Sequence, residues 1–340
     1  MQEIKLTQTT SFERPDILFS LCRDSASSLI YCGSSDANVY GFELSADEPL
    51  QKRLSGHRSY VSGTALTEQG LLVSSSWDRQ LIWWDLERGE LRRRVLAHDK
   101  WIRTVVSSPD RRLVASVADD MVCRIWDAAS GNLYRELRGH ATETPQHYAS
   151  MLFTCAFSPD GVHLATADKV GHIVVWDVRH GQSVATFESP ENYTWDAVQR
   201  RHSTGGVRSL CFSPDGKSLA VGGVGHIENI DGLRGASLIQ VYDWQTGELA
   251  HKFENDEHNG LVEELHYVRE GTLLVAAGGA KKGFLHFIDL SNGQFIHSEA
   301  TPMHIHQLET SDSVERILAV GHGMVAAWDI KANEESGEET

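Results

Sequence analysis

The stretch SSSWDRQLIWWD, residues 74–85, decides how the rest of the chain is interpreted. It holds the dipeptide Trp-Asp twice, at Trp77-Asp78 and at Trp84-Asp85. The second copy ends an apolar run and precedes a turn-forming ERGE segment, the pattern of a strand followed by a hairpin turn. The first copy lies seven residues earlier, in a polar connection. The two copies therefore need separate interpretations.

Dipeptides like the second copy recur along the whole chain. Successive occurrences are separated by 42, 42, 50, 66, 46 and 40 residues, which gives a base period near 42. Each unit contains four short β-rich runs with Gly, Asp, Asn and Pro turns between them, which predicts a four-stranded antiparallel sheet. The column consists of Phe42-Glu43, Trp84-Asp85, Trp126-Asp127, Trp176-Asp177, Tyr242-Asp243, Ile288-Asp289 and Trp328-Asp329.

This pattern resembles the WD40 family of β-propellers, and Gly56-His57, Ala97-His98 and Gly139-His140 match the family's upstream dipeptide. The resemblance implies an all-β, seven-bladed propeller of four-stranded antiparallel blades over residues 1–330. Residues 331–340 are acidic and polar, so we expect a disordered tail. Since blade 7 then lacks a strand, residues 3–9 are expected to complete it and close the ring.

In the family, an Asp six residues before the Trp bonds a His of the preceding loop and ties the blade together. The matching Asp residues are Asp36, Asp78 and Asp120 in blades 1 to 3. The set is complete in blade 2, with His57 and Trp84, and in blade 3, with His98 and Trp126. Blades 4 to 7 depart from the pattern and are expected to be less tightly braced; they carry Val170, Ala236, Lys282 and His322 there.

The composition excludes several classes of function. The 340 residues carry a formal net charge of −16, which argues against a general binder of nucleic acid or of anionic membranes. The five cysteines are scattered without a CxxC motif, and the start MQEIKLTQTT lacks the basic and apolar regions of a secretory signal. We therefore expect a cytoplasmic protein that is a monomeric propeller on its own.

Extra length concentrates in the loops expected on one face, called the top, which carries the strand 2–3 loops and the connections between blades. The long segments are 141–150, 189–206 and 224–235. Long loops grouped on one face of a rigid scaffold indicate function, whereas drift in surface loops would spread them over both faces.

The resemblance implies a non-catalytic scaffold that binds a protein or peptide on this top face, mainly on blades 2 to 5. Aromatic residues and Arg, which dominate interface energetics, occupy many of the matching rim positions. Trp77, one residue before the blade Asp, is among them, whereas Trp84 belongs to the core column. The predicted partner-binding residues are Tyr60, Trp77, Trp101, Arg103, Asp119, Met151, Phe153, Trp195 and Arg208.

Two alternatives stay open. No P-loop, GxSxG or HExxH motif is present, so we predict neither an enzyme nor a cofactor, yet a propeller enzyme or small-ligand binder could use the channel mouth under residues 189–235. There, Glu228, Asn229 and Asp231 offer oxygen ligands. No metal site is predicted, but His304, His306 and His322 fall near the top of blade 7 and leave that alternative open.

Overall fold

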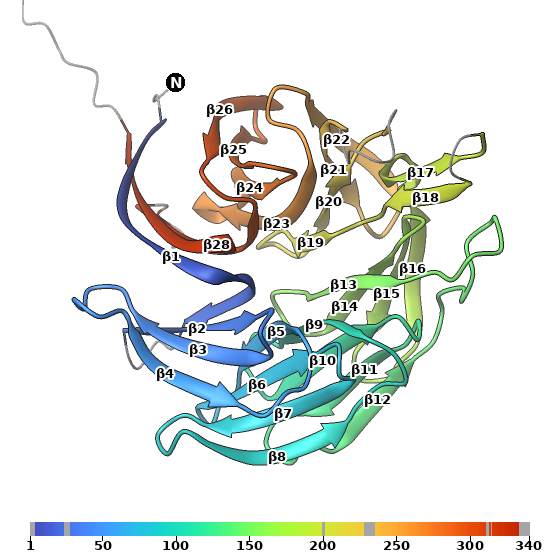
Figure 1. Ribbon diagram of the computed structural model, residues 1–340. Coiled ribbons are helices and arrows are strands. Elements are labelled where there is room, and N and C mark those ends of the chain that lie inside the picture. The colour runs from blue at the N-terminus through green and yellow to red at the C-terminus, as the bar shows by residue number, and fades with distance from the viewer. Residues whose placement is uncertain are drawn as a thin grey trace, which may run out of the picture.

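A computed structural model describes residues 4–23, 28–198, 201–227, 235–310, 313 and 315–332. Sheets of antiparallel strands follow one another around a ring, each running from an inner first strand to an outer fourth strand (Figure 1). Along a strand, residues either alternate between buried and exposed or are buried on both faces of the sheet. The reason is that each sheet packs against a neighbour on either face, as in the propeller architecture. The protein is thus an all-β propeller with four-stranded antiparallel blades.

Five sheets have four strands, in chain order within each sheet. They comprise β5 (Val61–Leu66), β6 (Leu71–Ser76), β7 (Gln80–Asp85) and β8 (Glu90–Leu96); β9 (Ile102–Ser107), β10 (Leu113–Ala118), β11 (Cys123–Asp127) and β12 (Leu133–Leu137); β13 (Leu152–Phe157), β14 (His163–Asp168), β15 (His172–Asp177) and β16 (Ser183–Glu188); β19 (Ser209–Phe212), β20 (Ser218–Val224), β21 (Ser237–Asp243) and β22 (Glu248–Asn255); β23 (Leu261–Val268), β24 (Leu273–Gly279), β25 (Gly283–Asp289) and β26 (Gln294–Thr301).

The sixth large sheet contains both ends of the described chain. Its strands run in the order β27 (Ile305–Thr310), β28 (Arg316–Ala332), β1 (Ile4–Arg23), β2 (Leu29–Ser34), β3 (Asn38–Glu43) and β4 (Leu50–Ser55). The prediction of seven separate blades is therefore corrected: the described residues form six large sheets. The physical reason is the length of β1, which pairs with β28 through Ile4–Ile17 and with β2 through Leu18–Arg23, so that one strand joins two repeats.

Smaller elements lie between the large sheets. The hairpin of β17 (Tyr193–Asp196) and β18 (His202–Gly205) stands apart from the ring of sheets (Figure 1). Two short 3₁₀ helices, η1 (Pro190–Asn192) and η2 (Arg269–Gly271), occupy turns. Part of the segment 189–206 is thus built as a hairpin and not as an irregular loop, which its sequence did not indicate.

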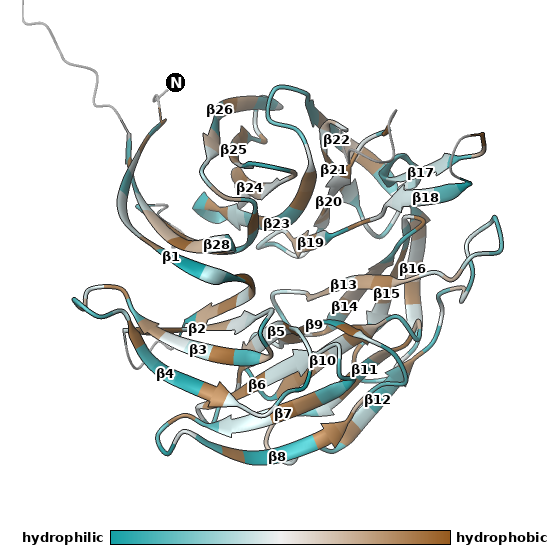
Figure 2. Ribbon diagram, in the orientation of Figure 1, coloured by the Kyte–Doolittle hydropathy of each residue, from teal (hydrophilic) through white to brown (hydrophobic). Residues whose placement is uncertain are grey.

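The core lies between adjacent sheets. Trp83 packs with Ile102 and Val114 of the next sheet, whereas Trp84 packs with Tyr31 and Val39 of the preceding one, so consecutive residues of β7 are buried on opposite faces. Outer strands such as β4 and β8 are interrupted by hydrophilic residues (Figure 2), as expected of edges that must not pair with another sheet.

Candidate partner-binding site

A repeated backbone hydrogen bond positions the rim residues on the top face. In one sheet the Trp77 amide donates to the Tyr60 carbonyl at 3.0 Å, and in the next the Asp119 amide donates to the Trp101 carbonyl at 3.0 Å. This bond joins the residue before the first strand to the loop that follows the second strand. It therefore places both residues at the same level along the propeller axis in each sheet. Side chains from separate sheets are thereby brought level with one another.

Four of these side chains form an aromatic row, consisting of Phe19, Tyr60, Trp77 and Trp101. Their neighbouring ring centroids lie 5.6, 4.7 and 4.5 Å apart in that order. Tyr60 is 39% exposed and Trp101 is 48% exposed, whereas Trp77 between them is half-buried. The row thus presents exposed aromatic surface to solvent, which a partner can cover with little loss of side-chain entropy.

Next to the row lies a cavity of about 470 Å³ at the centre of the ring. Its lining includes one side chain from each of the seven repeats: six lie just before the first strand or within its first three residues, and one lies further along the long strand β1. We call this set the channel mouth; its members are Phe19, Ser62, Arg103, Phe153, Arg208, Glu263 and His306.

Arg103 links the row to the channel mouth. Its Nε and Nη2 donate to the two carboxylate oxygens of Asp119 at 2.6 and 2.7 Å. Its guanidinium also lies 5.5 Å from the Trp77 ring and 5.4 Å from the Phe153 ring. A bidentate carboxylate on one edge and aromatic faces around it fix this side chain in one geometry.

Two further cations, Lys169 and Arg208, lie near the charge of Arg103 and have fewer partners. The Arg208 guanidinium lies 3.7 Å from the Phe153 ring centroid, and its Nε is buried without a hydrogen-bond partner. Lys169 is buried and forms no ion pair within the described part of the chain; burial, followed by the charges of Arg208 and Arg103, lowers the pKa of its ammonium group. Arg103, Lys169 and Arg208 thus outnumber the nearby carboxylate of Asp119, and a bound anionic group would relieve that imbalance.

The repeat that follows Arg208 contributes Glu263. Burial raises the pKa of its carboxyl group, but the neighbouring His304, His306 and Arg208 side chains outweigh burial and bring the pKa to about 2. Glu263 is thus a carboxylate at neutral pH. The channel mouth thus has cations on the third to fifth repeats and an anionic carboxylate on the next repeat, close to Arg208.

Most of the residues predicted from the sequence lie in this region, and one does not. Met151 contacts Arg103, with its sulfur 3.5 Å from Nη2. Trp195 instead lies on β17, where its ring is 5.4 Å from that of Tyr148, and it lines neither the row nor the channel mouth. The residues brought together are Tyr60, Trp77, Trp101, Arg103, Asp119, Met151, Phe153 and Arg208.

The sequence interpretation missed Phe19, Lys169, Glu263 and His306 as members of this region. Phe19 is two residues after Ile17, as Arg103 is two residues after Trp101, and both Ile17 and Trp101 accept the repeated rim hydrogen bond. Applying the same positional rule to the first and sixth repeats would have found Phe19 and Glu263. Glu228, Asn229 and Asp231, the oxygen ligands considered for a cation, lie outside the described residues, as do residues 333–340 of the predicted tail.

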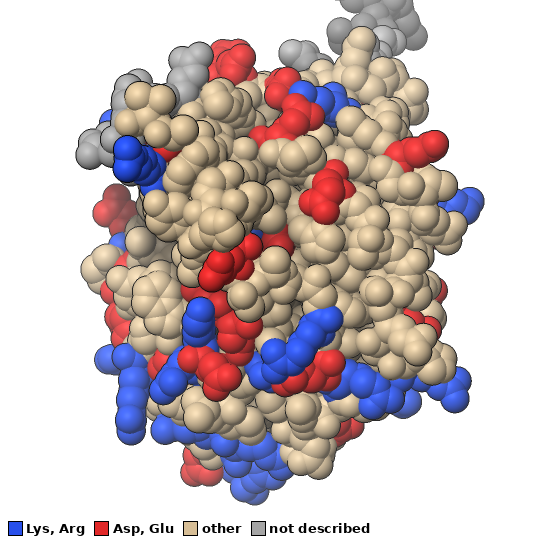
Figure 3. Space-filling view, turned by 90° about the vertical axis from the view of Figure 1, so that its right-hand side faces the viewer, with Lys and Arg blue, Asp and Glu red and all other residues tan. Residues whose placement is uncertain are grey.

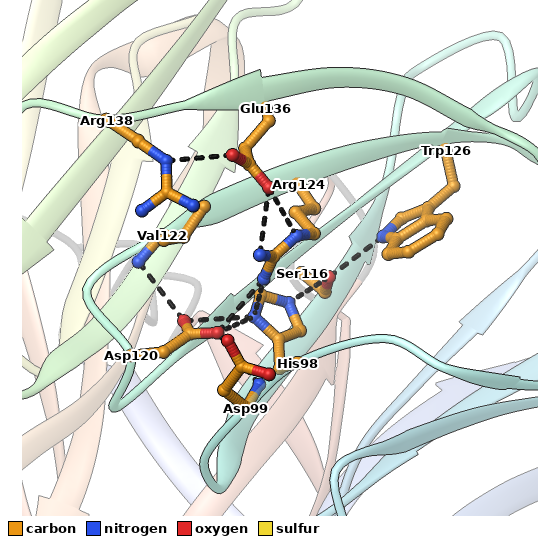
Figure 4. A network of polar contacts seen from close by, with 9 residues as sticks. All are labelled: His98, Asp99, Ser116, Asp120, Val122, Arg124, Trp126, Glu136 and Arg138. Carbon is orange, nitrogen blue, oxygen red and sulfur yellow. Dashed lines mark hydrogen bonds and ion pairs between the residues drawn. The ribbon is translucent and has the colours of Figure 1, made fainter.

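Hydrogen-bond chains brace the sheets beneath the rim. In the sheet of β9–β12, the Trp126 Nε1 donates to Ser116 Oγ at 2.9 Å, His98 Nε2 lies 2.8 Å from the same oxygen, and His98 Nδ1 lies 3.1 Å from Asp120 (Figure 4). Burial raises the pKa of Asp120, but His98 and Arg124 outweigh it and hold that pKa well below its usual range. The equivalent chain before it joins Trp84, Ser74, His57 and Asp78.

Two predicted features of the braces are corrected. The sheet of β13–β16 is not less braced, because Asp168, two residues before Val170, takes the role: His140 Nδ1 lies 3.0 Å from Asp168 and His140 Nε2 lies 2.8 Å from Thr166. Asp36 bonds Asn38 and Tyr40 of its own sheet and no loop His. The rule of an Asp six residues before the Trp fails in both places. Loop length and the available partner side chains, and not the spacing alone, determine which carboxylate contacts a His.

The basic run 91–98 lies on the outer strand β8. Arg93 donates to the Ala129 carbonyl and Arg94 to the Gly56 carbonyl, at 3.4 and 2.7 Å. Figure 3 shows Lys and Arg side chains gathered at the lower end of the molecule, where Figure 1 places β8. These cations lie on an outer strand of the sheet, where charged side chains disfavour pairing with another sheet.

The sheets define a propeller, and comparison with known proteins gives its family. A family model described as "WD domain, G-beta repeat" matches residues 48–85, 89–127, 131–177 and 195–226. The chain is a WD40-repeat protein.

Several curated proteins are similar to parts of the chain. The nuclear distribution protein PAC1 of Arthroderma benhamiae is 28% identical over 55% of this chain and 42% of its own length. The guanine nucleotide-binding protein subunit beta of Nicotiana tabacum is 28% identical over 57% of this chain and 51% of its own. Human apoptotic protease-activating factor 1 is 29% identical over 62% of this chain and 16% of its own. The chain thus spans about half or less of these relatives.

In the described ranges, none of the helices has the length and apolar character needed to cross a bilayer.

Proposed function

We propose that the protein is a non-catalytic scaffold that binds a protein or peptide segment on the aromatic row and in the channel mouth. One observation carries this proposal: Trp77 and Trp101 stack on each other and both contact Arg103. Exposed aromatic surface therefore lies directly beside a cation held in one geometry. WD-repeat propellers such as the G-protein beta subunit typically act as protein-interaction scaffolds, which supports the same class of function.

The charges favour a particular kind of ligand. Although the whole chain carries a net charge of −16, Arg208 lines the cavity, Lys169 lies near the charges of Arg208 and Arg103, and neither forms an ion pair among the described residues. An acidic side chain of a partner would supply the missing counter-charge, while a neighbouring aromatic or apolar side chain covers Trp101. We therefore propose a partner segment in which acidic and apolar residues alternate or adjoin.

The absence of a convergent acid, base and nucleophile supports a binding role over catalysis. The described residues of the channel mouth contain no Ser, Cys or Thr within hydrogen-bond reach of a His there, and Arg103 is already committed to Asp119.

We also propose that the N-terminal half of β1 closes the propeller by acting as the outer strand beside β28. Ile4 pairs with Ala332 and Glu13 with Met324, while Phe19, further along the same strand, lines the channel mouth. Closure of the ring would therefore help to hold the binding surface rigid.

A display selection tests the proposed function. Random peptides are selected on the full chain, and the affinity of selected peptides is measured for wild type, Trp101→Ala and Arg208→Gln. Tyr134→Ala, an exposed aromatic on the outer strand β12, is the matched control. We expect acidic and aromatic residues among the selected peptides and a loss of about 2 kcal/mol for the two rim variants only. Equal binding by all four proteins would overturn the proposal.

A further inference from the structure

Three imidazoles and a carboxylate meet on the wall of the channel where two sheets adjoin. Glu263 lies on β23, His304 directly precedes β27, and His306 lies on β27. One ligand atom from each of these three residues lies within 4.8 Å of the others. The exposed His322 ring lies 4.8 Å from the His304 ring and 5.0 Å from the His306 ring, centroid to centroid. The His306 ring of this cluster lies 5.1 Å from the ring of Phe19, the first member of the aromatic row, and Glu263 lies close to the charge of Arg208.

The hydrogen bond between His304 and the Ala280 carbonyl determines which ring nitrogen of His304 carries the hydrogen. Nδ1 lies 3.2 Å from the Ala280 carbonyl oxygen, and since a carbonyl only accepts, Nδ1 carries the hydrogen. In the neutral ring, Nε2 then has a lone pair, and it lies 3.5 Å from Oε1 of Glu263. A lone pair and a carboxylate oxygen repel each other unless a cation lies between them.

The separation of these two atoms favours a metal ion as that cation. A charged N–H···O hydrogen bond measures about 2.7–2.9 Å, so 3.5 Å is too long for a proton shared in this way. Nitrogen and oxygen ligands of one tetrahedral zinc ion, at about 2.0–2.2 Å from the metal, are about 3.4 Å apart. The observed distance is therefore close to that between two ligands of one zinc ion and not to that of a charged hydrogen bond.

Two imidazole nitrogens of this cluster are buried without a hydrogen-bond partner. The His304 side chain is 7% exposed and the Glu263 side chain 17% exposed, and Nε2 of both His304 and His306 is buried with no hydrogen-bond partner. Leaving a buried polar atom unpaired costs about 1–3 kcal/mol, so two such atoms beside one carboxylate call for an explanation.

We propose that Glu263, His304 and His306 bind one divalent transition-metal ion of the zinc class, with His322 as the fourth ligand. Imidazole and carboxylate donors suit this class of ion. The Ala280 carbonyl acts on His304 as the outer partner that orients a metal-ligating imidazole. His306 has to rotate toward the other two ligands, and it faces the channel cavity, where the space for that rotation exists.

Arg208 supplies an internal check on this proposal. Its charge is close enough to lower the pKa of Glu263, so it opposes a second cation at the same carboxylate. Arg208→Gln should therefore strengthen metal binding by several-fold, the opposite of its expected effect on an acidic peptide. Trp101→Ala should leave metal binding unchanged, so that failure of the peptide site and failure of the metal site can be told apart.

The test uses the full chain, freed of metal with a chelator and titrated with Zn²⁺ and with Co²⁺. We expect one ion per chain, a higher melting temperature with Zn²⁺, and the absorption spectrum of four-coordinate Co²⁺. His306→Asn and Glu263→Gln should each weaken binding by more than the roughly 10- to 100-fold that loss of an outer partner costs. His297→Asn, which removes an imidazole 3.3 Å from Glu299 on β26, is the control and should bind as wild type.

Three results would overturn the proposal. They are the absence of stoichiometric binding by the wild-type chain, a Co²⁺ spectrum of six-coordinate type, and unchanged affinity in His306→Asn and Glu263→Gln. Should either variant fail to fold, His322→Asn, which alters an exposed side chain in a turn of β28, replaces it, and its expected result is weaker binding with a changed Co²⁺ spectrum.

Discussion

Trp77 and Trp101 stack face to face, with ring centroids 4.5 Å apart and planes inclined by 4°, although they come from two different sheets. Arg103 lies beside both rings, 5.5 and 5.7 Å from their centroids. The rims of consecutive sheets are thus joined by one aromatic stack that ends at a cation. Such a stack is rigid before any partner arrives, which lowers the entropy cost of binding.

The two kinds of tryptophan should separate stability from binding. Trp84 is 2% exposed and bonds Ser74 through its indole N–H, so Trp84→Ala should lower the free energy of unfolding by about 3–5 kcal/mol. Trp101 is 48% exposed, and Trp101→Ala should cost within about 1 kcal/mol. Urea denaturation of both variants measures the difference. Trp77→Ala should fall near Trp101→Ala; a loss as large as that of Trp84→Ala would make Trp77 a core residue.

Asp168 should brace the sheet of β13–β16. Its side chain and that of His140 are 1% and 2% exposed, so Asp168→Ala leaves a buried imidazole nitrogen unpaired and should cost about 1–3 kcal/mol. Val170→Ala, at the position that the sequence spacing indicated, should change stability by about 0.5 kcal/mol or less. Thermal melts compare the two, and a larger loss in Val170→Ala would show that the spacing rule was correct after all.

These results show what the sequence can and cannot specify. The 42-residue period and the Trp column predict the four-stranded sheets and the burial of Trp84, because the faces of each propeller sheet need apolar residues. The merging of two repeats through β1 was not predicted, since a continuous strand and two separate strands have the same alternation of residues. Trp195 was misplaced because the length of a loop does not tell where its hairpin points.

Acid should destabilise the fold through buried histidines. Burial, reinforced by the charge of His258, lowers the pKa of His286 to about 3, and its ring nitrogens lie near Ser237 and Ser298. In the unfolded chain a His binds a proton near pH 6.5, so between about pH 6.5 and 3 the unfolded state binds more protons and stability falls.

Unfolding in urea at pH 7 and pH 5 measures this loss, and His286→Gln, which keeps a polar side chain without titrating, should reduce the difference between the two pH values. His163→Gln, at a partly exposed strand end, is the control and should show the wild-type difference. A wild-type pH dependence in His286→Gln would contradict this account of the buried ring.

The N-terminal strand should be needed for cooperative unfolding. Residues 4–13 pair with β28, and Ile4 is buried in the cluster that contains Trp328. A chain that starts at residue 11 should melt at a lower temperature and over a broader range, because it exposes the edge of β28 and opens the ring. Adding the missing segment as a peptide should restore part of the loss. A melting curve that matches the full chain would disprove closure by this strand.

The central claim is that the aromatic row and the cationic side of the channel mouth bind a partner segment. Its most direct test is the affinity of one selected acidic and aromatic peptide, measured by calorimetry for wild type, Trp101→Ala, Arg208→Gln and the double variant. Since all four proteins should fold, we predict losses of about 2 kcal/mol for each single variant and a larger loss for the double. Unchanged affinity in the double variant, with a wild-type melting temperature, would contradict the claim.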